Sequence, residues 1–396
     1  MTMAVSERPA LALLMMLLYL TFLNLLFSPV NCYTPVSDAT LKSLPRSGSD
    51  FDIHNGAILA PILRPRVPGT PGSIAVLEHF VNFFKKNLPD WRLEFQNSTS
   101  RTPVTGDKQV PFVNLIAIQD PPFAKVGDVS RLTLAAHYDS KFTPEGFIGA
   151  IDSAAPCAML LHAVRSIDAA LTKKWKTMQL NPTDNLDIDA HQGIQIFLLD
   201  GEEAFGEWTA TDSLYGARSL AEHMEHDYYP ALSTFKTSLS AIRLFVLLDL
   251  LGSKDPVMPS FFATTHWAYK HLAQLEQRLR KLGLFKSDPD PKKGAPKAWF
   301  TEGNRPSDRK FLSFISDDHI PFMQRGVEIL HLIPWPFPRG IWHTMADNAD
   351  NLDPPTVEDW STLITAFAAE WMDLEGFFDT KTSKQARLDV EDKSEL

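Results

Sequence analysis

The sequence predicts an α/β protein with a single domain, in which helices flank a central, twisted, mostly parallel mixed sheet. Five short runs of apolar and β-branched residues have the length of buried strands, and longer segments with helical spacing lie between them. Strands that alternate with helices typically form a parallel sheet covered on both faces. With 396 residues, of which 44% are hydrophobic, the chain can bury a large core around such a sheet.

The expected strands and helices follow one another along most of the chain. We expect strands at residues 112–118, 131–136, 194–199, 242–248 and 328–333. We expect helices at residues 72–84, 154–171, 213–226, 265–282 and 356–374. The polar stretch 172–192 and the Pro-, Lys- and Gly-rich stretch 287–306 are interpreted as surface insertions, not as domain boundaries. The catalytic domain is therefore expected at residues 56–379, after a linker at residues 33–55.

Both ends of the chain have features of a secretory-pathway protein. An apolar stretch at residues 10–27 is typical of a signal sequence and is also long enough for an uncleaved anchor. Residues 1–32 are expected to be one or the other, and a membrane is a partner only if the segment is an anchor. Asn97 begins an N-glycosylation acceptor sequence, and the polar tail 380–396 ends in Lys-Ser-Glu-Leu, which resembles a retention signal. We expect a lumenal protein that is either retained in the endoplasmic reticulum or secreted.

Composition excludes two other classes of protein. The formal net charge is −10, so the basic surface that nucleic-acid binding requires is not expected. The two cysteines, Cys32 and Cys157, are too few for a disulfide framework. The core must therefore stabilise the fold, and we expect a monomer without a nucleic-acid partner.

Polar residues with one shared chemistry follow the expected strands. Ligands bind outside the carboxyl ends of the strands in open α/β sheets, so the residues just after each apolar run are the ones to inspect. Acidic residues and a histidine stand there, namely His137, Asp139, Asp200, Glu202, Glu203 and Asp249. Asp152 begins the next expected helix, and His343 follows the last strand. Carboxylates and imidazoles are ligands that zinc prefers, so the sequence predicts a zinc site.

The adjacent acids Glu202 and Glu203 are the strongest part of this pattern. A single histidine or aspartate after a strand is more often structural, and an aspartate there commonly caps the next helix. Two neighbouring acids at the edge of a core repel each other unless a positive charge compensates. A metal ion would supply that charge, with one carboxylate as a ligand and the other free to carry protons.

Eight segments, taken together, resemble one known family. They are HYDSK (137–141), DSAAPCAML (152–160), FLLDGEEAF (197–205), DSLYG (212–216), LLDLLG (247–252), DDHIPF (317–322), HLIPWPFP (331–338) and WHTMADNADNLD (342–353). In this order they resemble the glutaminyl-peptide cyclotransferases, a branch of the zinc aminopeptidase family. The resemblance covers residues 56–374 and implies the zinc aminopeptidase fold, which is also described as phosphorylase/hydrolase-like.

The resemblance also implies a reaction and the residues that carry it out. The family converts the N-terminal glutamine of peptides or proteins to pyroglutamate and releases ammonia. By resemblance, Asp152, Glu203 and His343 would hold one catalytic zinc ion, and Glu202 would carry the proton. Asp249 and Asp317 would form a hydrogen-bonded pair near the reacting atoms. The glutamine side chain would lie between Trp208, Phe337 and Trp342, whereas Trp335 is equally compatible with a place in the core.

Two departures keep other readings open. Many animal members pair the helix cysteine with a cysteine before the HYDSK histidine, but here that position is Ala136. His137, Asp152 and Asp249 also resemble the ligands of a second zinc in the parent aminopeptidases, and Asp139 is a further candidate for that site or its support. Two metals would activate water, so the alternative is an aminopeptidase-like peptide hydrolase. A third possibility is a lumenal binding protein without catalytic activity.

Overall fold

The computed structural model describes residues 35–180, 191–288, 297–305 and 315–379. The expected signal segment 1–32 and the polar tail 380–396 lie outside these residues. The described chain forms an α/β fold around one mixed sheet, as predicted.

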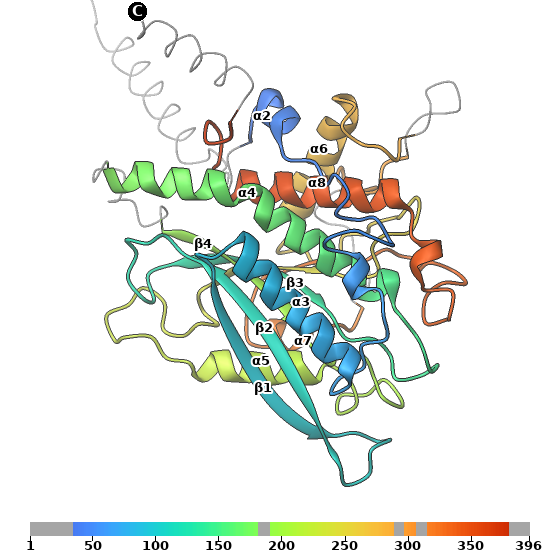
Figure 1. Ribbon diagram of the computed structural model, residues 1–396. Coiled ribbons are helices and arrows are strands. Elements are labelled where there is room, and N and C mark those ends of the chain that lie inside the picture. The colour runs from blue at the N-terminus through green and yellow to red at the C-terminus, as the bar shows by residue number, and fades with distance from the viewer. Residues whose placement is uncertain (1–34, 181–190, 289–296, 306–314, 380–396) are drawn as a thin grey trace, which may run out of the picture. The chain divides into compact units, whose positions relative to one another are not determined.

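The sheet has six strands in the order β1-β2-β4-β3-β5-β6 (Figure 1). Their bounds are β1 Arg92–Arg101, β2 Gln109–Gln119, β3 Ser130–His137, β4 Gln192–Leu199, β5 Ile242–Leu248 and β6 Ile329–Leu332. Strands β4, β3, β5 and β6 run parallel to one another, whereas β2 pairs antiparallel with β4 and β1 antiparallel with β2. All five strands expected from the sequence are present.

Strand β1 was not predicted, because its sequence is mostly polar. Its ten residues are exposed or half-buried throughout, since β1 lies at the edge of the sheet. It forms a long antiparallel ribbon with β2, which extends away from the rest of the sheet in Figure 1. A run without a buried face lacks the apolar alternation by which strands are recognised.

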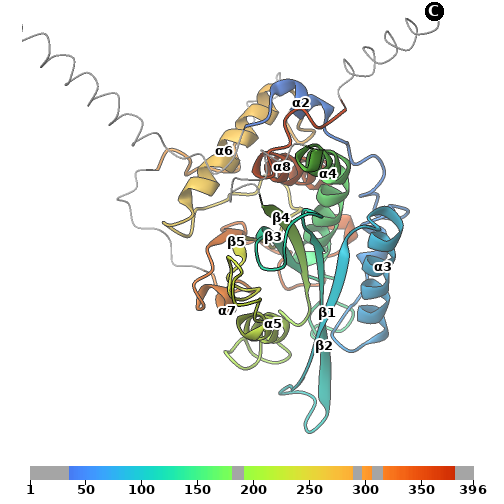
Figure 2. The same ribbon diagram turned by 90° about the vertical axis from the view of Figure 1, so that its left-hand side faces the viewer.

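The sheet separates two hydrophobic layers, and successive strand residues alternate between them. In β4, Ile194, Ile196 and Leu198 face the larger layer, while Phe197 and Leu199 face the smaller one. Helices α3, α4, α6 and α8 contribute to the larger layer, whereas α5 and α7 cover the opposite face (Figure 2). The parallel strands β3, β4, β5 and β6 are thus buried on both sides, which leaves their ends as the place for polar chemistry.

The described helices are α2 Asp38–Ser43, α3 Pro71–Asn87, α4 Ala155–Leu180, α5 Tyr215–His226, α6 His266–Lys281, α7 Ile320–Met323 and α8 Pro354–Trp371. The five predicted helices are therefore confirmed. Helix α4 continues nine residues past the predicted end at residue 171, into the segment interpreted as a surface insertion. Trp175 and Met178 are buried there, so apolar contacts extend the helix.

Residues 35–55 do not behave as a linker. Val36, Leu41, Leu44 and Phe51 are all buried in the larger hydrophobic layer. The backbone N–H of Val36 also donates a hydrogen bond to the Glu370 carboxylate at 3.0 Å. The folded unit therefore begins before residue 56, because scattered apolar residues in a polar segment still find places in the core.

The interpretation of residues 287–306 as a surface insertion is also partly wrong. Its described residues 297–305 include Trp299 and Phe300, which are buried. The Trp299 ring stacks on Trp360 of helix α8, with 4.7 Å between the ring centroids. A Pro-, Lys- and Gly-rich composition suggested a surface loop, but the two aromatic side chains anchor this part of it to the core.

Candidate metal centre and active site

The candidate site lies at the carboxyl ends of strands β3, β4 and β5. His137 is the last residue of β3, Asp200 follows β4, and Asp249 follows β5. Their side chains are buried, as are those of Glu202 and Glu203 in the loop after β4. The structure therefore brings together the strand-end residues that the sequence singled out.

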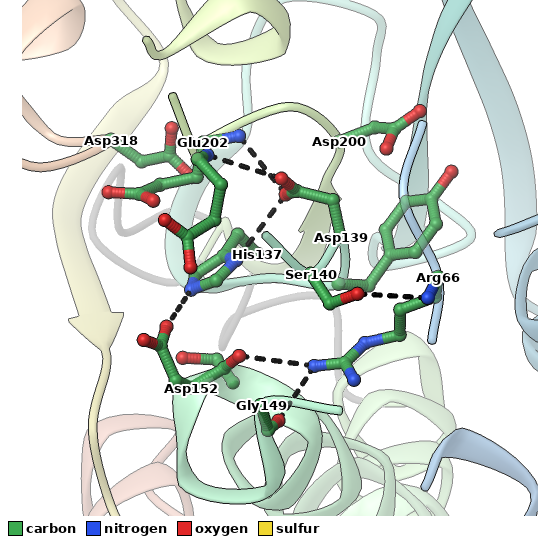
Figure 3. A network of polar contacts seen from close by, with 12 residues as sticks. Arg66, His137, Asp139, Ser140, Gly149, Asp152, Asp200, Glu202 and Asp318 are labelled. Carbon is green, nitrogen blue, oxygen red and sulfur yellow. Dashed lines mark hydrogen bonds and ion pairs between the residues drawn. The ribbon is translucent and has the colours of Figure 1, made fainter. Parts of the chain in front are cut away.

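Asp139 fixes the loop that carries the two glutamates. Its two carboxylate oxygens accept hydrogen bonds from the backbone N–H groups of Glu202, at 3.0 Å, and Glu203, at 3.2 Å (Figure 3). The same carboxylate lies 3.3 Å from Nδ1 of His137. Burial alone would raise the pKa of Asp139, but His137 and the two N–H groups outweigh it and lower this pKa. Asp139 is thus a charged anchor that orients both the glutamate loop and His137.

Asp152 lies in a kinked turn, Ala150–Ala154, directly before helix α4, and its own φ and ψ of −120° and 76° are not helical. Gly149 precedes this turn with φ of 61°, a left-handed conformation that favours glycine. A Cβ atom at this position would lie 2.1 Å from the carbonyl oxygen of Asp152. Only glycine therefore allows the chain to close so tightly around the candidate metal ligand.

Arg66 holds the same turn from the other side. Its guanidinium is fully buried and donates to the carbonyl oxygens of Gly149, at 2.9 Å, and Asp152, at 3.2 Å (Figure 3). Its backbone N–H donates to Ser140 Oγ at 2.9 Å. Burial lowers the pKa of Arg66, and the charges of neighbouring acids, among them Asp152, partly offset this effect. Arg66 therefore brings positive charge and backbone support to an acidic site.

The loop that carries His343 is tied to the Asp152 turn through Asp347. The Asp347 carboxylate accepts a hydrogen bond from the backbone N–H of Ile151 at 2.8 Å. Burial, together with the nearby Asp152 charge, raises the pKa of Asp347 to about 7. His343 itself has φ of 57°, which is uncommon for a residue other than glycine, and such backbone strain concentrates at functional sites.

Asp152, Glu203 and His343 form a group that fits a metal ion. Nε2 of His343 lies 3.5 Å from Asp152 Oδ2 and 3.7 Å from Glu203 Oε2. In a tetrahedral zinc site with bonds of about 2.0 Å, ligand atoms lie roughly 3.3 Å apart. Asp152 Oδ2 and Glu203 Oε1 are also buried without a hydrogen-bond partner among the described residues. Burial lowers the pKa of His343, which favours the neutral imidazole that binds metals.

His137, Asp152 and Asp249 form a second, deeper group. Nε2 of His137 lies 3.0 Å from Asp152 Oδ1 and 3.3 Å from Asp249 Oδ1. Burial alone would lower the pKa of His137, but hydrogen bonds to the surrounding aspartates raise it well above its usual value. The alternative reading assigned these three residues to a second metal, and their ligand atoms also lie close enough together to hold one.

A pocket of about 430 Å³ opens onto the first group. Glu202, Asp152 and His343 contribute to its lining, as do Trp208, Phe337 and Trp342. The rings of Phe337 and Trp342 lie 4.6 Å apart, and the ring of Trp342 lies 4.1 Å from that of His343. The aromatic walls therefore reach directly to a candidate metal ligand.

Asp249 and Asp317 are both buried near this pocket, but their hydrogen bonds go elsewhere. Asp249 accepts from Ser153 Oγ and from the backbone N–H of Leu250 at 2.8 Å. Asp317 Oδ2 lies 2.7 Å from Nε2 of His331. Burial raises the pKa of Asp317, and the charge of Asp249 adds to this effect. The pair that the resemblance implied is thus an electrostatic contact here, with His331 as the hydrogen-bond partner of Asp317.

Glu202 lines the pocket and does not belong to the group formed by Asp152, Glu203 and His343. Burial raises the pKa of Glu202 well above its usual range, and the charge of His137 opposes this shift in part. Its neighbour Glu203 differs, because Glu203 Oε2 lies 3.2 Å from Lys141 Nζ and belongs to the metal-binding group. The two adjacent glutamates therefore occupy distinct environments.

Four residues of the site were missed from the sequence, namely Arg66, Lys141, Asp347 and His331. Lys141 and His331 stand inside the HYDSK and HLIPWPFP segments, so the segments could have drawn attention to them. Arg66 carries no such signal, because a lone arginine among prolines is usually a surface residue. Cys157 is free, and its thiol donates to the carbonyl oxygen of His137 at 3.2 Å, beside Ala136.

This fold and site define the class of protein, an α/β protein with a buried carboxylate and histidine centre. The profile of peptidase family M28 matches residues 121–368. The match covers more than half of the chain, which therefore belongs to this family. The fold predicted from the resemblance is confirmed.

Within this class the chain belongs to the glutaminyl-peptide cyclotransferases. It is 40% identical over 327 residues to the glutaminyl-peptide cyclotransferase of Gloydius blomhoffii, covering 80% of each chain. It is also 40% identical over 322 residues to the mouse glutaminyl-peptide cyclotransferase-like protein, covering 81% of this chain and 75% of that protein. The crystal structure of Macrostomum lignano glutaminyl cyclase is 30% identical, with a TM-score of 0.67 over 86% of this chain and 93% of that chain.

Proposed function

We propose that this enzyme cyclises the N-terminal glutamine of peptides or proteins to pyroglutamate and releases ammonia. The observation that carries the proposal is the pocket, in which aromatic side chains lie beside Asp152 and His343 of the first metal-binding group and beside the carboxylate of Glu202. Such a pocket suits a side chain that folds back on its own amine in a dry space. Membership of the cyclotransferase family supports the same reaction.

The reaction needs no nucleophile from the protein. The α-amino nitrogen of the glutamine attacks its own side-chain amide carbon, so a carbon–nitrogen bond forms and closes the five-membered ring. The bond between that carbon and the amide nitrogen then breaks, and the nitrogen leaves as ammonia. One proton must move from the attacking amine to the leaving nitrogen. The protein therefore has to orient the substrate, stabilise charge on the amide oxygen and carry a proton.

Asp152, Glu203 and His343 would hold a zinc ion, which supplies a Lewis acid toward the amide oxygen. Glu202 faces the same pocket and is the group we assign to proton transfer. Asp249, which lines the pocket, would help to hold the substrate amine and the leaving group in place, and the buried Asp317 would act on Asp249 through its charge. Trp208, Phe337 and Trp342 would enclose the glutamine side chain and exclude water.

We expect one catalytic metal ion per chain, in the group with His343. His343 lines the pocket beside Trp342, whereas His137 of the inner group is fully buried and outside the pocket lining. Substrate can therefore reach the outer group through the pocket. A peptide hydrolase with two metals would instead need water activated between both groups.

Replacing Trp342 with alanine tests the pocket assignment. Ammonia release from an N-terminal glutamine peptide should fall about tenfold or more in kcat/KM, because the wall beside the reacting centre is lost. Metal content should stay the same, since the indole is not a ligand. Trp267→Ala is the control, because Trp267 is similarly exposed and stacks on Trp371 in helix α8. Equal activity of the Trp342 variant and the control would contradict the assignment.

We further propose that the chain works in the lumen of the secretory pathway. The apolar stretch 10–27 and the terminal Lys-Ser-Glu-Leu support this location, and Asn97 is exposed on strand β1, where a glycan could be attached. Deleting residues 393–396 should increase the fraction of protein secreted by expressing cells. A full-length protein that is cytosolic and carries no glycan at Asn97 would contradict the proposal.

A further inference from the structure

A row of aromatic rings extends beyond the pocket wall into solvent. The ring of Trp335 lies 5.1 Å from that of Phe337, which lies 4.6 Å from Trp342. The inner end of the row is His343, a candidate metal ligand. The outer end is Trp335, which is 47% exposed and not a core residue. The row therefore runs from the reacting centre to the surface.

The backbone that carries Trp335 is restrained. The sequence 334–338 reads Pro-Trp-Pro-Phe-Pro, so three prolines alternate with the two aromatic residues. Each proline fixes its own φ and restricts the residue before it. The backbone N–H of Trp335 also donates to the carbonyl oxygen of Val257 at 2.9 Å. An exposed ring on such a stiff segment can bind a partner with little loss of conformational entropy.

We propose that Trp335 forms a subsite for the second residue of the substrate and favours an aromatic or large apolar side chain there. This inference rests on the proposed function, which places the N-terminal glutamine in the pocket that Phe337 and Trp342 line. The next residue of the peptide leaves the pocket, and successive Cα atoms lie about 3.8 Å apart. The length of one peptide residue is therefore similar to the distance between neighbouring rings, which is 5.1 Å from Trp335 to Phe337.

The arrangement and the exposure of the rings indicate which side chains this subsite would bind. The Trp335 and Phe337 rings are nearly perpendicular, with an interplanar angle of 82°, so the edge of one meets the face of the other. About half of the Trp335 surface stays open to solvent. Covering the apolar surface of this indole with another aromatic or aliphatic group lowers the free energy of the complex. Glycine at the second position could not provide such a contact.

The test compares two peptides, Gln-Phe-Ala and Gln-Gly-Ala, by the rate of ammonia release from the full chain. The wild-type enzyme should prefer Gln-Phe-Ala, and Trp335→Ala should reduce this preference about three- to tenfold. The loss should appear as a higher KM for Gln-Phe-Ala with kcat unchanged, because a contact outside the reacting centre contributes uniform binding. Trp335→Phe should keep most of the preference, and Trp267→Ala should keep all of it.

The outcomes separate the subsite from the reaction. If Trp335→Ala lowers turnover of both peptides equally, the ring only supports the pocket, and the subsite is overturned. A wild-type enzyme with no preference between the peptides, or a variant with an unchanged preference, would overturn it as well. If the wild-type enzyme releases ammonia from neither peptide, the proposed function fails, and the subsite fails with it.

Discussion

Replacing Glu202 with glutamine should lower kcat for glutamine cyclisation by roughly 10²- to 10⁴-fold while the metal stays bound. Glutamine has nearly the same size as glutamate, so the pocket lining and the Asp139 hydrogen bond to the residue 202 backbone are retained. What disappears is the carboxylate that can accept and return a proton. Ammonia release and metal content should be measured on the same preparation.

Two results would contradict this assignment. A Glu202→Gln variant with wild-type kcat would remove the residue from proton transfer. A variant that loses its metal would place Glu202 among the ligands instead. The thermal unfolding midpoint serves as the control, because a correctly folded variant should unfold close to the wild-type temperature.

Replacing Glu203 with glutamine should weaken metal binding by about 100-fold or more, since it removes one of two charged ligands. Activity should fall with metal occupancy. Metal binding can also be measured without any substrate, because a metal that binds only the folded state stabilises it by an amount that rises with the logarithm of its affinity. Added zinc should therefore raise the unfolding midpoint of the metal-free wild-type protein and of the Glu202 variant, whereas the Glu203 variant should need about 100-fold more zinc for the same rise.

The two adjacent glutamates act as matched controls for each other. Both are buried in the same loop, and Asp139 binds the backbone N–H of each. Their side chains differ in direction, because only that of Glu203 belongs to the group with Asp152 and His343. Equal loss of metal in both variants would show that the roles of the two residues have been misassigned.

The sequence predicted the parts of the fold that repeat regularly. Buried strands and long helices leave periodic patterns, so β3, β4 and β5 and the acids that follow them could be placed in advance. Parallel strands end at one edge of the sheet, and this rule brought His137, Asp139 and Asp249 together without any distance information. Asp152 and His343 also contribute to the first metal-binding group, as the resemblance implied.

Features that leave no periodic hydrophobic pattern in the sequence could not be predicted in this way. Strand β1 has no buried face, and residues 35–55 reach the core through isolated apolar side chains. Arg66 donates hydrogen bonds to carbonyl groups that lie far from it in the sequence. The type of a residue does not predict contacts of this kind. Trp335 illustrates the same limit, since an aromatic residue between prolines fits either the core or a pocket rim until its exposure is known.

The central claim is that one metal-binding centre serves cyclisation and not hydrolysis. The most direct test measures zinc per chain and identifies the products that the same sample forms from glutaminyl, leucyl and alanyl peptides. We expect one zinc ion per chain, with ammonia and a pyroglutamyl peptide formed in equal amounts from the glutaminyl substrate only. Release of free N-terminal amino acids from the leucyl or alanyl peptides, rising with a second equivalent of zinc and without cyclised product, would contradict it.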